Sequence, residues 1–130
     1  MKKLAALFLT LLSSPLLAQV TFIIDSLPAY TPPEDLIYIA GNFNAWNPGD
    51  AAYVLSKGED EKWFYTSQVA PQGTQIEFKF TRGSWETVEK GASMEEIPNR
   101  TFTFGNGDTI HVIIYNWASG GGTGSTAAEN

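Results

Sequence analysis

The sequence predicts an all-β domain, an antiparallel, immunoglobulin-like β-sandwich of about seven to eight strands. Short runs rich in β-branched and aromatic residues recur along the chain, and turn-forming residues separate them roughly every 8–12 residues. None of these runs has the apolar period of a helix. At 130 residues the chain is long enough for one domain with a hydrophobic core.

The clearest strand is predicted at 74–81. Ile76, Phe78 and Phe80 alternate with polar residues, Lys79 among them. This period of two is typical of a strand with one buried face. One side of the strand is therefore expected to seal the core, and the other side to project Lys79 toward solvent.

The same signals predict the other elements. In chain order, strands are expected at 20–24, 36–40, 53–55, 62–69, 101–104 and 109–115, with Trp117 closing the domain. Tight turns are expected at 71–73, 83–84 and 105–108, and a loop at 90–96.

Two longer loops carry aromatic residues. The segment 27–35 contains three prolines and is predicted to be an extended loop with Tyr30 in its middle. The segment 42–50 is rich in Asn, Pro and Gly and contains Trp46. An indole in such a polar, turn-rich loop is not expected to pack in the core, so we expect Trp46 to be available to a ligand.

The first eighteen residues have the layout of a secretory signal peptide. Lys2 and Lys3 precede the apolar run 4–12, and a cleavage position is expected after Ala18. The alternative is a short membrane anchor, but a Ser-Ser-Pro sequence interrupts the run well short of about 20 apolar residues. We therefore expect a secreted or periplasmic protein with no membrane contact after cleavage.

The predicted folded domain spans residues 19–118. The segment 119–130 is rich in Gly, Ser and Thr, the composition of a flexible tail or linker. We interpret the chain as the binding module of a longer relative, which would carry a catalytic domain.

Composition narrows the possible partners. The chain has no cysteine, so an exported form must depend on its core for stability. Loss of Lys2 and Lys3 with the signal peptide leaves six basic against fourteen acidic side chains, a net charge of −8. This charge disfavours nucleic acid and anionic membranes but leaves neutral ligands unaffected.

Catalytic apparatus is not evident in the sequence. The single histidine, His111, is predicted to lie in an apolar strand as a structural residue. The carboxylates occur as adjacent pairs in turns, where solvation is expected, whereas a glycosidase needs two that face each other across a cleft. We predict no enzyme activity, no metal and no cofactor.

The best candidate functional residues are indoles, an ammonium and an amide. Flat aromatic rings suit the apolar C–H faces of sugars, and Lys or Asn side chains can bind the surrounding hydroxyls. Trp46, Trp85, Lys79 and Asn99 supply these groups. The alternatives are that Lys79 is only a solvent-facing strand residue, Trp85 a lid over the core edge, and Asn99 a turn former.

Several motifs, in order, resemble a known family. The carriers are Ile37 to Gly41, Ala45 to Pro48, Lys62-Trp63, Pro71 to Thr74, Glu77 to Phe80, Pro98 to Phe102 and Val112 to Trp117. Together they resemble the starch-binding domains, the family-20 carbohydrate-binding modules, and the related glycogen-binding modules. The resemblance covers roughly residues 20–117 and implies a non-catalytic domain that binds α-glucan.

The resemblance also implies particular site residues. The family's first sugar site is matched by Trp46, Lys79 and Asn99, but the position of its second tryptophan is occupied by Met94. Trp85, on a neighbouring loop, is the candidate to replace that ring.

The family's second site is matched by Tyr30 and Trp63. Trp63 and Trp117 are also expected to pack in the core or at its edge. Two alternatives to sugar binding remain open at this point, a protein-interaction module and an accessory domain of a secreted hydrolase whose sugar site has decayed.

Overall fold

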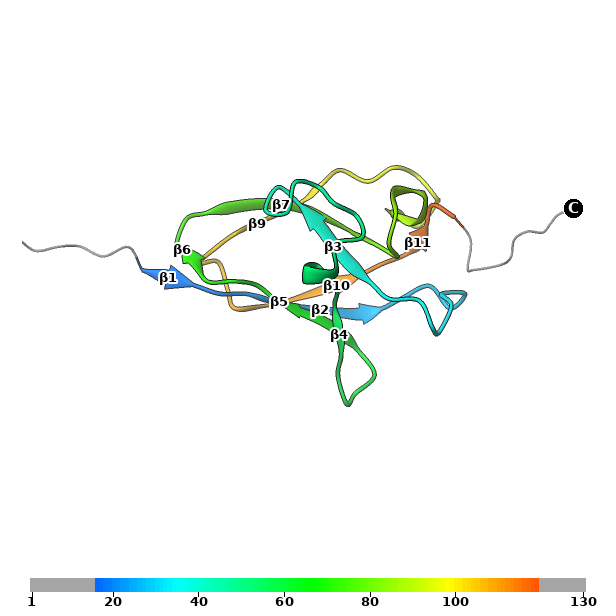
Figure 1. Cartoon of the computed structure of the whole chain (residues 1–130), viewed down its shortest axis with the longest axis horizontal. Helices are drawn as coiled ribbons and strands as arrows, with labels where there is room; N and C mark the ends of the chain where they lie inside the picture. Colours follow the sequence, from blue (N-terminus) through cyan, green and yellow to red (C-terminus); the bar gives the residue numbers. More distant parts are fainter. Residues whose placement is uncertain (1–15, 120–130) are drawn as a thin grey trace, which may run out of the picture.

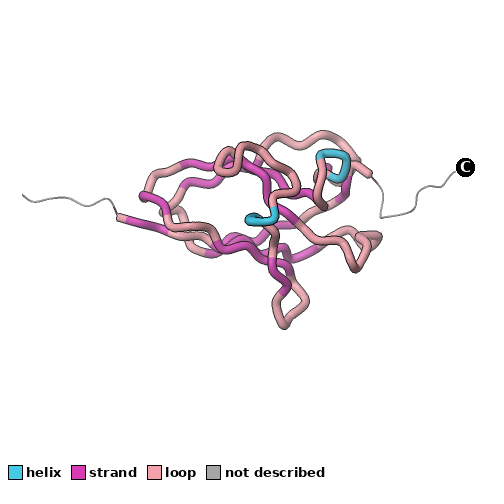
Figure 2. Tube along the Cα trace, in the orientation of Figure 1, coloured by secondary structure: helices cyan, strands magenta, loops and turns pink. Residues whose placement is uncertain are grey.

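The computed structural model describes residues 16–119, and in this range its regular elements are strands and two short 3₁₀ helices (Figures 1 and 2). The predicted all-β, sandwich-like fold is confirmed. Residues 1–15 of the predicted signal peptide and 120–130 of the predicted linker lie outside the described residues.

One sheet has four strands in the order β10-β2-β5-β4. These are β2 (Thr21–Ser26), β4 (Ser56–Lys57), β5 (Trp63–Thr66) and β10 (Thr109–Ile113). The β2–β5 and β4–β5 pairs are antiparallel, whereas β10 runs parallel to β2. This one pair departs from the predicted antiparallel pattern because the turn at 105–108 carries the chain from one sheet to the other.

The second sheet has three antiparallel strands in the order β3-β7-β9. These are β3 (Tyr38–Gly41), β7 (Gln75–Thr81) and β9 (Arg100–Thr103). The alternation predicted for the central strand β7 is confirmed for its three apolar residues, which are buried, and for Glu77 and Lys79, which are not. Thr81 is buried although polar, because its hydroxyl donates a hydrogen bond to the Pro48 carbonyl of the loop that covers it.

Aromatic rings from both sheets fill the core between them. The Phe22 ring of β2 lies 4.7 Å from the ring of Phe78 on β7 and 5.6 Å from that of Phe102 on β9, centroid to centroid. Trp117 is fully buried in the same core, as predicted. The core is therefore sealed without disulfides.

Two small antiparallel pairs lie at the ends of the domain. Strand β1 (Leu17–Ala18) pairs with β6 (Ala70–Pro71), and β8 (Glu89–Lys90) pairs with β11 (Asn116–Trp117). The two pairs lie near opposite ends of the long axis (Figure 1). Strand β1 consists of the last two residues of the predicted signal peptide.

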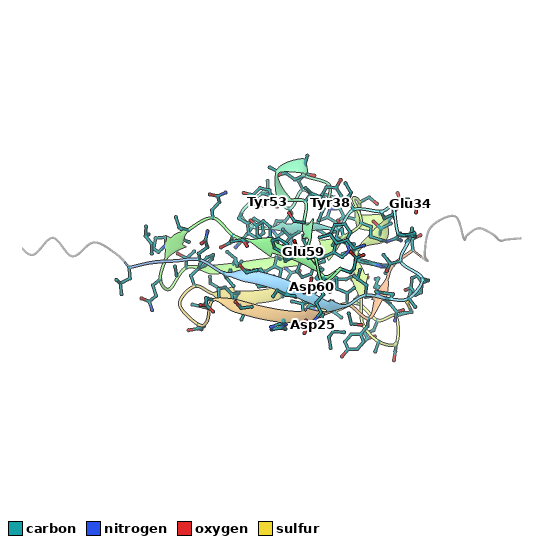
Figure 3. All side chains as sticks on the ribbon, turned by 90° about the horizontal axis from the view of Figure 1, so that it is seen from below. Asp25, Glu34, Tyr38, Tyr53, Glu59 and Asp60 are labelled. Atoms are coloured by element: carbon teal, nitrogen blue, oxygen red, sulfur yellow. The ribbon has the colours of Figure 1, made fainter. Side chains whose placement is uncertain are left out.

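One local expectation differs from the structure. The predicted strand at 53–55 is replaced by the 3₁₀ helix η1 (Ala51–Tyr53), which the Asp50 side chain caps, and a single bridge between Val54 and Tyr38. His111, expected as a structural residue of a strand, lies on the solvent face of β10, where its Nδ1 is 2.9 Å from Oδ1 of Asp25. Asp25 and Tyr53 lie on opposite sides of the molecule (Figure 3).

Candidate ligand-binding surface

The loop 42–50 presents Trp46 at the end of β3. The Asn44 side chain fixes the loop, since its Oδ1 accepts the Gly41 N–H at 2.9 Å and its Nδ2 donates to the Ile39 carbonyl at 3.2 Å. The backbone N–H of Trp46 donates to the Gly41 carbonyl at 2.9 Å. Backbone bonds to a buried strand therefore hold the root of the indole.

The backbone at the tip of this loop is unusual. Ala45 and Trp46 have φ values of 56° and 57°, in the left-handed region that residues with a side chain rarely adopt. Such residues cost of order 1–3 kcal/mol each and cluster at ligand-binding sites. The conformation directs the half-buried Trp46 ring away from the core and toward the neighbouring turn.

A close approach of two glycines brings that neighbouring turn to the loop. A Cβ on Gly49 would lie 2.6 Å from the carbonyl oxygen of Gly83, so only glycine permits this spacing. Gly83 leads into the 3₁₀ helix η2 (Trp85–Thr87), whose start is capped by Ser84 and Thr87. As a result the centroids of the Trp46 and Trp85 rings lie 6.4 Å apart, with their planes inclined by 40°.

This pair of rings, which we call the indole platform, remains accessible. Trp85 is 43% exposed and Trp46 is half-buried. Neither indole N–H has a hydrogen-bond acceptor within residues 16–119. Both N–H groups can therefore donate to a ligand.

Lys79 lies on the outer face of β7, opposite Ala40 of β3. Ala40 immediately precedes Gly41, which holds the Trp46 backbone, so Lys79 borders the root of loop 42–50. Its ammonium has no hydrogen-bond or ion-pair partner among the described residues. The pKa of Glu96 is lowered chiefly by a hydrogen bond from Lys90, with a smaller contribution from the charge of Lys79.

Asn99 lies beside the same face of β7. Its Nδ2 donates to Oε1 of Glu77 at 3.2 Å, and Glu77 projects on the same side as Lys79, two residues further along the strand. In the part of the chain that the structure describes, the Asn99 Oδ1 accepts no hydrogen bond. Asn99 thus offers an acceptor near the donor of Lys79.

The four candidates are arranged along the outer face of β7. The Asn99 amide is hydrogen-bonded to Glu77, and Lys79 lies two residues further along the strand. Loop 42–50, which carries Trp46, is hydrogen-bonded to the strand at Thr81. Met94, at the family's tryptophan position, is exposed in the 91–95 turn and has a φ of 64°. The second ring beside Trp46 therefore comes from η2.

Tyr30 and Trp63 are not brought together in the same way. The Tyr30 hydroxyl donates to Oδ1 of Asn116 at 2.9 Å and accepts the backbone N–H of Trp117 at 3.0 Å. These two bonds tie the proline loop to β11. Trp63 is half-buried against the core, with the Lys57 ammonium 5.7 Å from its ring centroid. It lines a hollow of about 190 Å³ together with prolines of the 27–35 loop, and Tyr30 is not among the lining residues.

Two residues near this surface were missed by the sequence reasoning. Glu77 holds the Asn99 amide, and its position two residues before Lys79 was the available signal. Tyr115 is exposed, and the alternation at the end of β10, where Val112 and Ile114 are the apolar residues that become buried, is the signal for it. The strand predicted at 109–115 does not by itself distinguish its two faces.

Two further features of residues 16–119 concern metal ligands and membrane-spanning helices. No group of three or more His, Cys, Asp or Glu side chains in residues 16–119 could hold a metal ion. In the same range no helix has the length and apolar character to cross a membrane.

The fold and this surface define a class of protein. A small β-sandwich that exposes two neighbouring indoles, and an ammonium and an amide along the outer face of its central strand, is suited to carbohydrate binding. The chain belongs to the starch-binding domain family, whose model matches residues 17–113. The predicted family is therefore confirmed.

The chain is similar to short segments of an α-amylase and two amylopullulanases. An α-amylase of Niallia circulans is 40% identical over 93 residues, which cover 71% of this chain and 7% of that protein. Amylopullulanases of Thermoanaerobacter thermohydrosulfuricus and Thermoanaerobacterium thermosulfurigenes are 43% and 38% identical, over 74% and 71% of this chain. The matched segments are only 6% and 5% of those two proteins.

A solved structure supports the fold. The glycoside hydrolase family 15 glucoamylase from Hypocrea jecorina matches 82% of this chain and 18% of its own, with a TM-score of 0.53 and 22% sequence identity.

Proposed function

We propose that this chain is a non-catalytic module that binds α-glucan of the starch or glycogen type through Trp46, Trp85, Lys79 and Asn99. The observation that carries the proposal is the 6.4 Å spacing of the two indole rings on an accessible surface. Two inclined rings can contact the apolar faces of successive glucose units in a curved α-linked chain. Membership of the starch-binding domain family supports the same ligand.

The polar groups beside the rings suit a neutral polyol. The Lys79 ammonium can donate to sugar hydroxyls, and the Asn99 Oδ1 can accept from them. Neither group has to break an existing bond to a described residue in order to do so. Affinity per site is expected to be modest, because an open surface must offset the ordering of ligand and side chains.

A second, smaller contact is proposed at Trp63 and Tyr30. The hollow beside Trp63 would take one sugar ring, while Tyr30 would offer its ring face and keep its hydroxyl bonded to β11. Trp63→Ala should then lower binding to the polymer while leaving a short oligosaccharide at the indole platform unaffected. Equal loss for both ligands would contradict a separate contact.

The chain is further proposed to be exported through residues 1–18 and to be joined in longer relatives to a catalytic domain through a linker like 119–130. Tethering a binding module in this way raises the local concentration of substrate around an enzyme. The sizes of the relatives support this organisation, because the matched segments are only 5–7% of their lengths.

Affinity electrophoresis in gels that contain soluble starch tests the main proposal. The wild-type protein should be retarded, and the Trp46→Ala variant should migrate as in a gel without starch. Unretarded migration of folded wild-type protein would favour the alternatives, a protein-interaction module or an accessory domain with a decayed site. The position of Trp85 beside Trp46 is the observation against decay, since Trp85 would then supply the ring missing at Met94.

A further inference from the structure

A groove of about 290 Å³ lies between Asn99 and Tyr115. We call it the Tyr115 groove; residues 89–91, residues 97–100 and Tyr115 line it.

Tyr115 projects into solvent because of the strand that precedes it. Val112 and Ile114 point into the core, so Ile113 and Tyr115 point outward. Tyr115 is 56% exposed. An aromatic ring that lines a groove and is so exposed can act as a stacking surface for a ligand.

The charged groups of the groove are already paired. The Arg100 guanidinium binds the buried Glu89 carboxylate at 2.8–3.1 Å and the Ile113 carbonyl at 3.0 Å. The Lys90 ammonium binds Glu96. The groove therefore offers apolar surface and the free Asn99 oxygen rather than a net charge, which suits a neutral ligand.

We propose that the Tyr115 groove is an additional subsite for the same α-glucan chain, in which Tyr115 stacks on a glucose unit beyond those held at the indole platform. This inference rests on the proposed function. Asn99, one of the four residues proposed to bind the glucan, also lines the groove, so a chain that contacts Asn99 can continue into the groove. An α-glucan is a polymer, and its further units can occupy this surface.

Calorimetric titration with maltotriose and maltoheptaose tests the subsite. Maltotriose is short enough to stay at the indole platform, whereas maltoheptaose can reach Tyr115. Tyr115→Ala should weaken maltoheptaose binding roughly three- to tenfold, as expected for one aromatic contact, and leave maltotriose binding unchanged. Tyr115→Phe should keep the wild-type affinity for both, and Leu36→Ala, which removes an exposed apolar side chain elsewhere, should change neither.

The outcomes separate the subsite from the proposed function. If Trp46→Ala abolishes binding but Tyr115→Ala changes nothing, or weakens both oligosaccharides equally, the subsite is overturned and the platform stands. If the folded wild-type protein binds neither oligosaccharide, the proposed function itself fails. Far-ultraviolet circular dichroism of each variant shows whether it is folded.

Discussion

The rings of Trp46 and Trp85 lie 6.4 Å apart at an angle of 40°, although they belong to different loops. Trp46 follows β3, and Trp85 lies in the short helix η2 after β7. Because β3 and β7 are antiparallel, loop 42–50 leaves the sheet opposite Phe78 and runs back to the end of β7. There the Pro48 carbonyl accepts the Thr81 hydroxyl and Gly49 approaches Gly83. Contacts between the two loops thus provide the platform that a single loop could not.

Trp85→Ala is expected to lower affinity for malto-oligosaccharides by about tenfold or more, because half of the apolar platform is removed. Met94→Ala is the matched control. Met94 occupies the family's tryptophan position and is exposed, yet we expect its truncation to leave affinity unchanged. Calorimetric titration measures both, and a larger loss in Met94→Ala than in Trp85→Ala would show that η2 does not replace the missing ring.

Gly49→Ala is expected to damage the platform without touching either ring. The added Cβ would lie 2.6 Å from the Gly83 carbonyl oxygen, so the two loops must separate, at a cost of about 1–3 kcal/mol in unfolding free energy. Starch affinity should fall as the rings move apart. In Gly58→Ala, the control, the Cβ would come closest to the Asp60 side chain and would be in ordinary contact with the Lys62 carbonyl oxygen at 3.5 Å, so affinity should be retained. Unchanged retardation of Gly49→Ala in starch gels would mean that the glycine contact does not set the ring spacing.

Features with a local cause could be predicted from the sequence. The faces of β7 follow from alternation, and the position of Trp46 in a solvent-facing loop follows from its Asn, Pro and Gly neighbours. The family could be predicted because its motifs are short and ordered.

Features that depend on distant contacts could not be predicted. The meeting of Trp46 with Trp85 requires the approach of Gly49 to Gly83, which no local pattern encodes. The use of the Tyr30 hydroxyl to hold β11 is equally remote, since its partners lie at the far end of the chain. The local sequence around a tyrosine in a proline-rich loop does not indicate whether its hydroxyl is free or hydrogen-bonded.

Asp25 is expected to make stability sensitive to acid. A hydrogen bond with His111 and another from Lys62 lower the pKa of Asp25 below its usual value. A carboxyl whose pKa is lower in the folded state stabilises the fold above the unfolded pKa near 4, and this contribution is lost as the pH falls through the folded value. Asp25→Asn should therefore lower the melting temperature at pH 6 but not at pH 2.

Thermal unfolding across this pH range gives the comparison. Glu34→Gln is the control, because Glu34 is exposed and has no ion pair among the described residues. It should change the melting temperature little at either pH. An equal loss in Asp25→Asn at both pH values would indicate a packing effect instead of the charged hydrogen bonds.

Glu89 is expected to contribute strongly to the stability of the end of the sandwich nearest the Tyr115 groove. It is 1% exposed, accepts the Phe80 N–H at 2.9 Å and receives two nitrogens of Arg100. Glu89→Gln leaves the guanidinium without its counter-charge and should lower the free energy of unfolding by about 3–5 kcal/mol, measured by urea titration. Glu89→Gln combined with Arg100→Met should recover part of this loss, because the unpaired cation is then removed. The loss in unfolding free energy of the double variant is compared with the losses of Glu89→Gln and Arg100→Met measured singly. If the loss in the double variant equals the sum of the two single losses, the two side chains act independently and the pair does not stabilise this end.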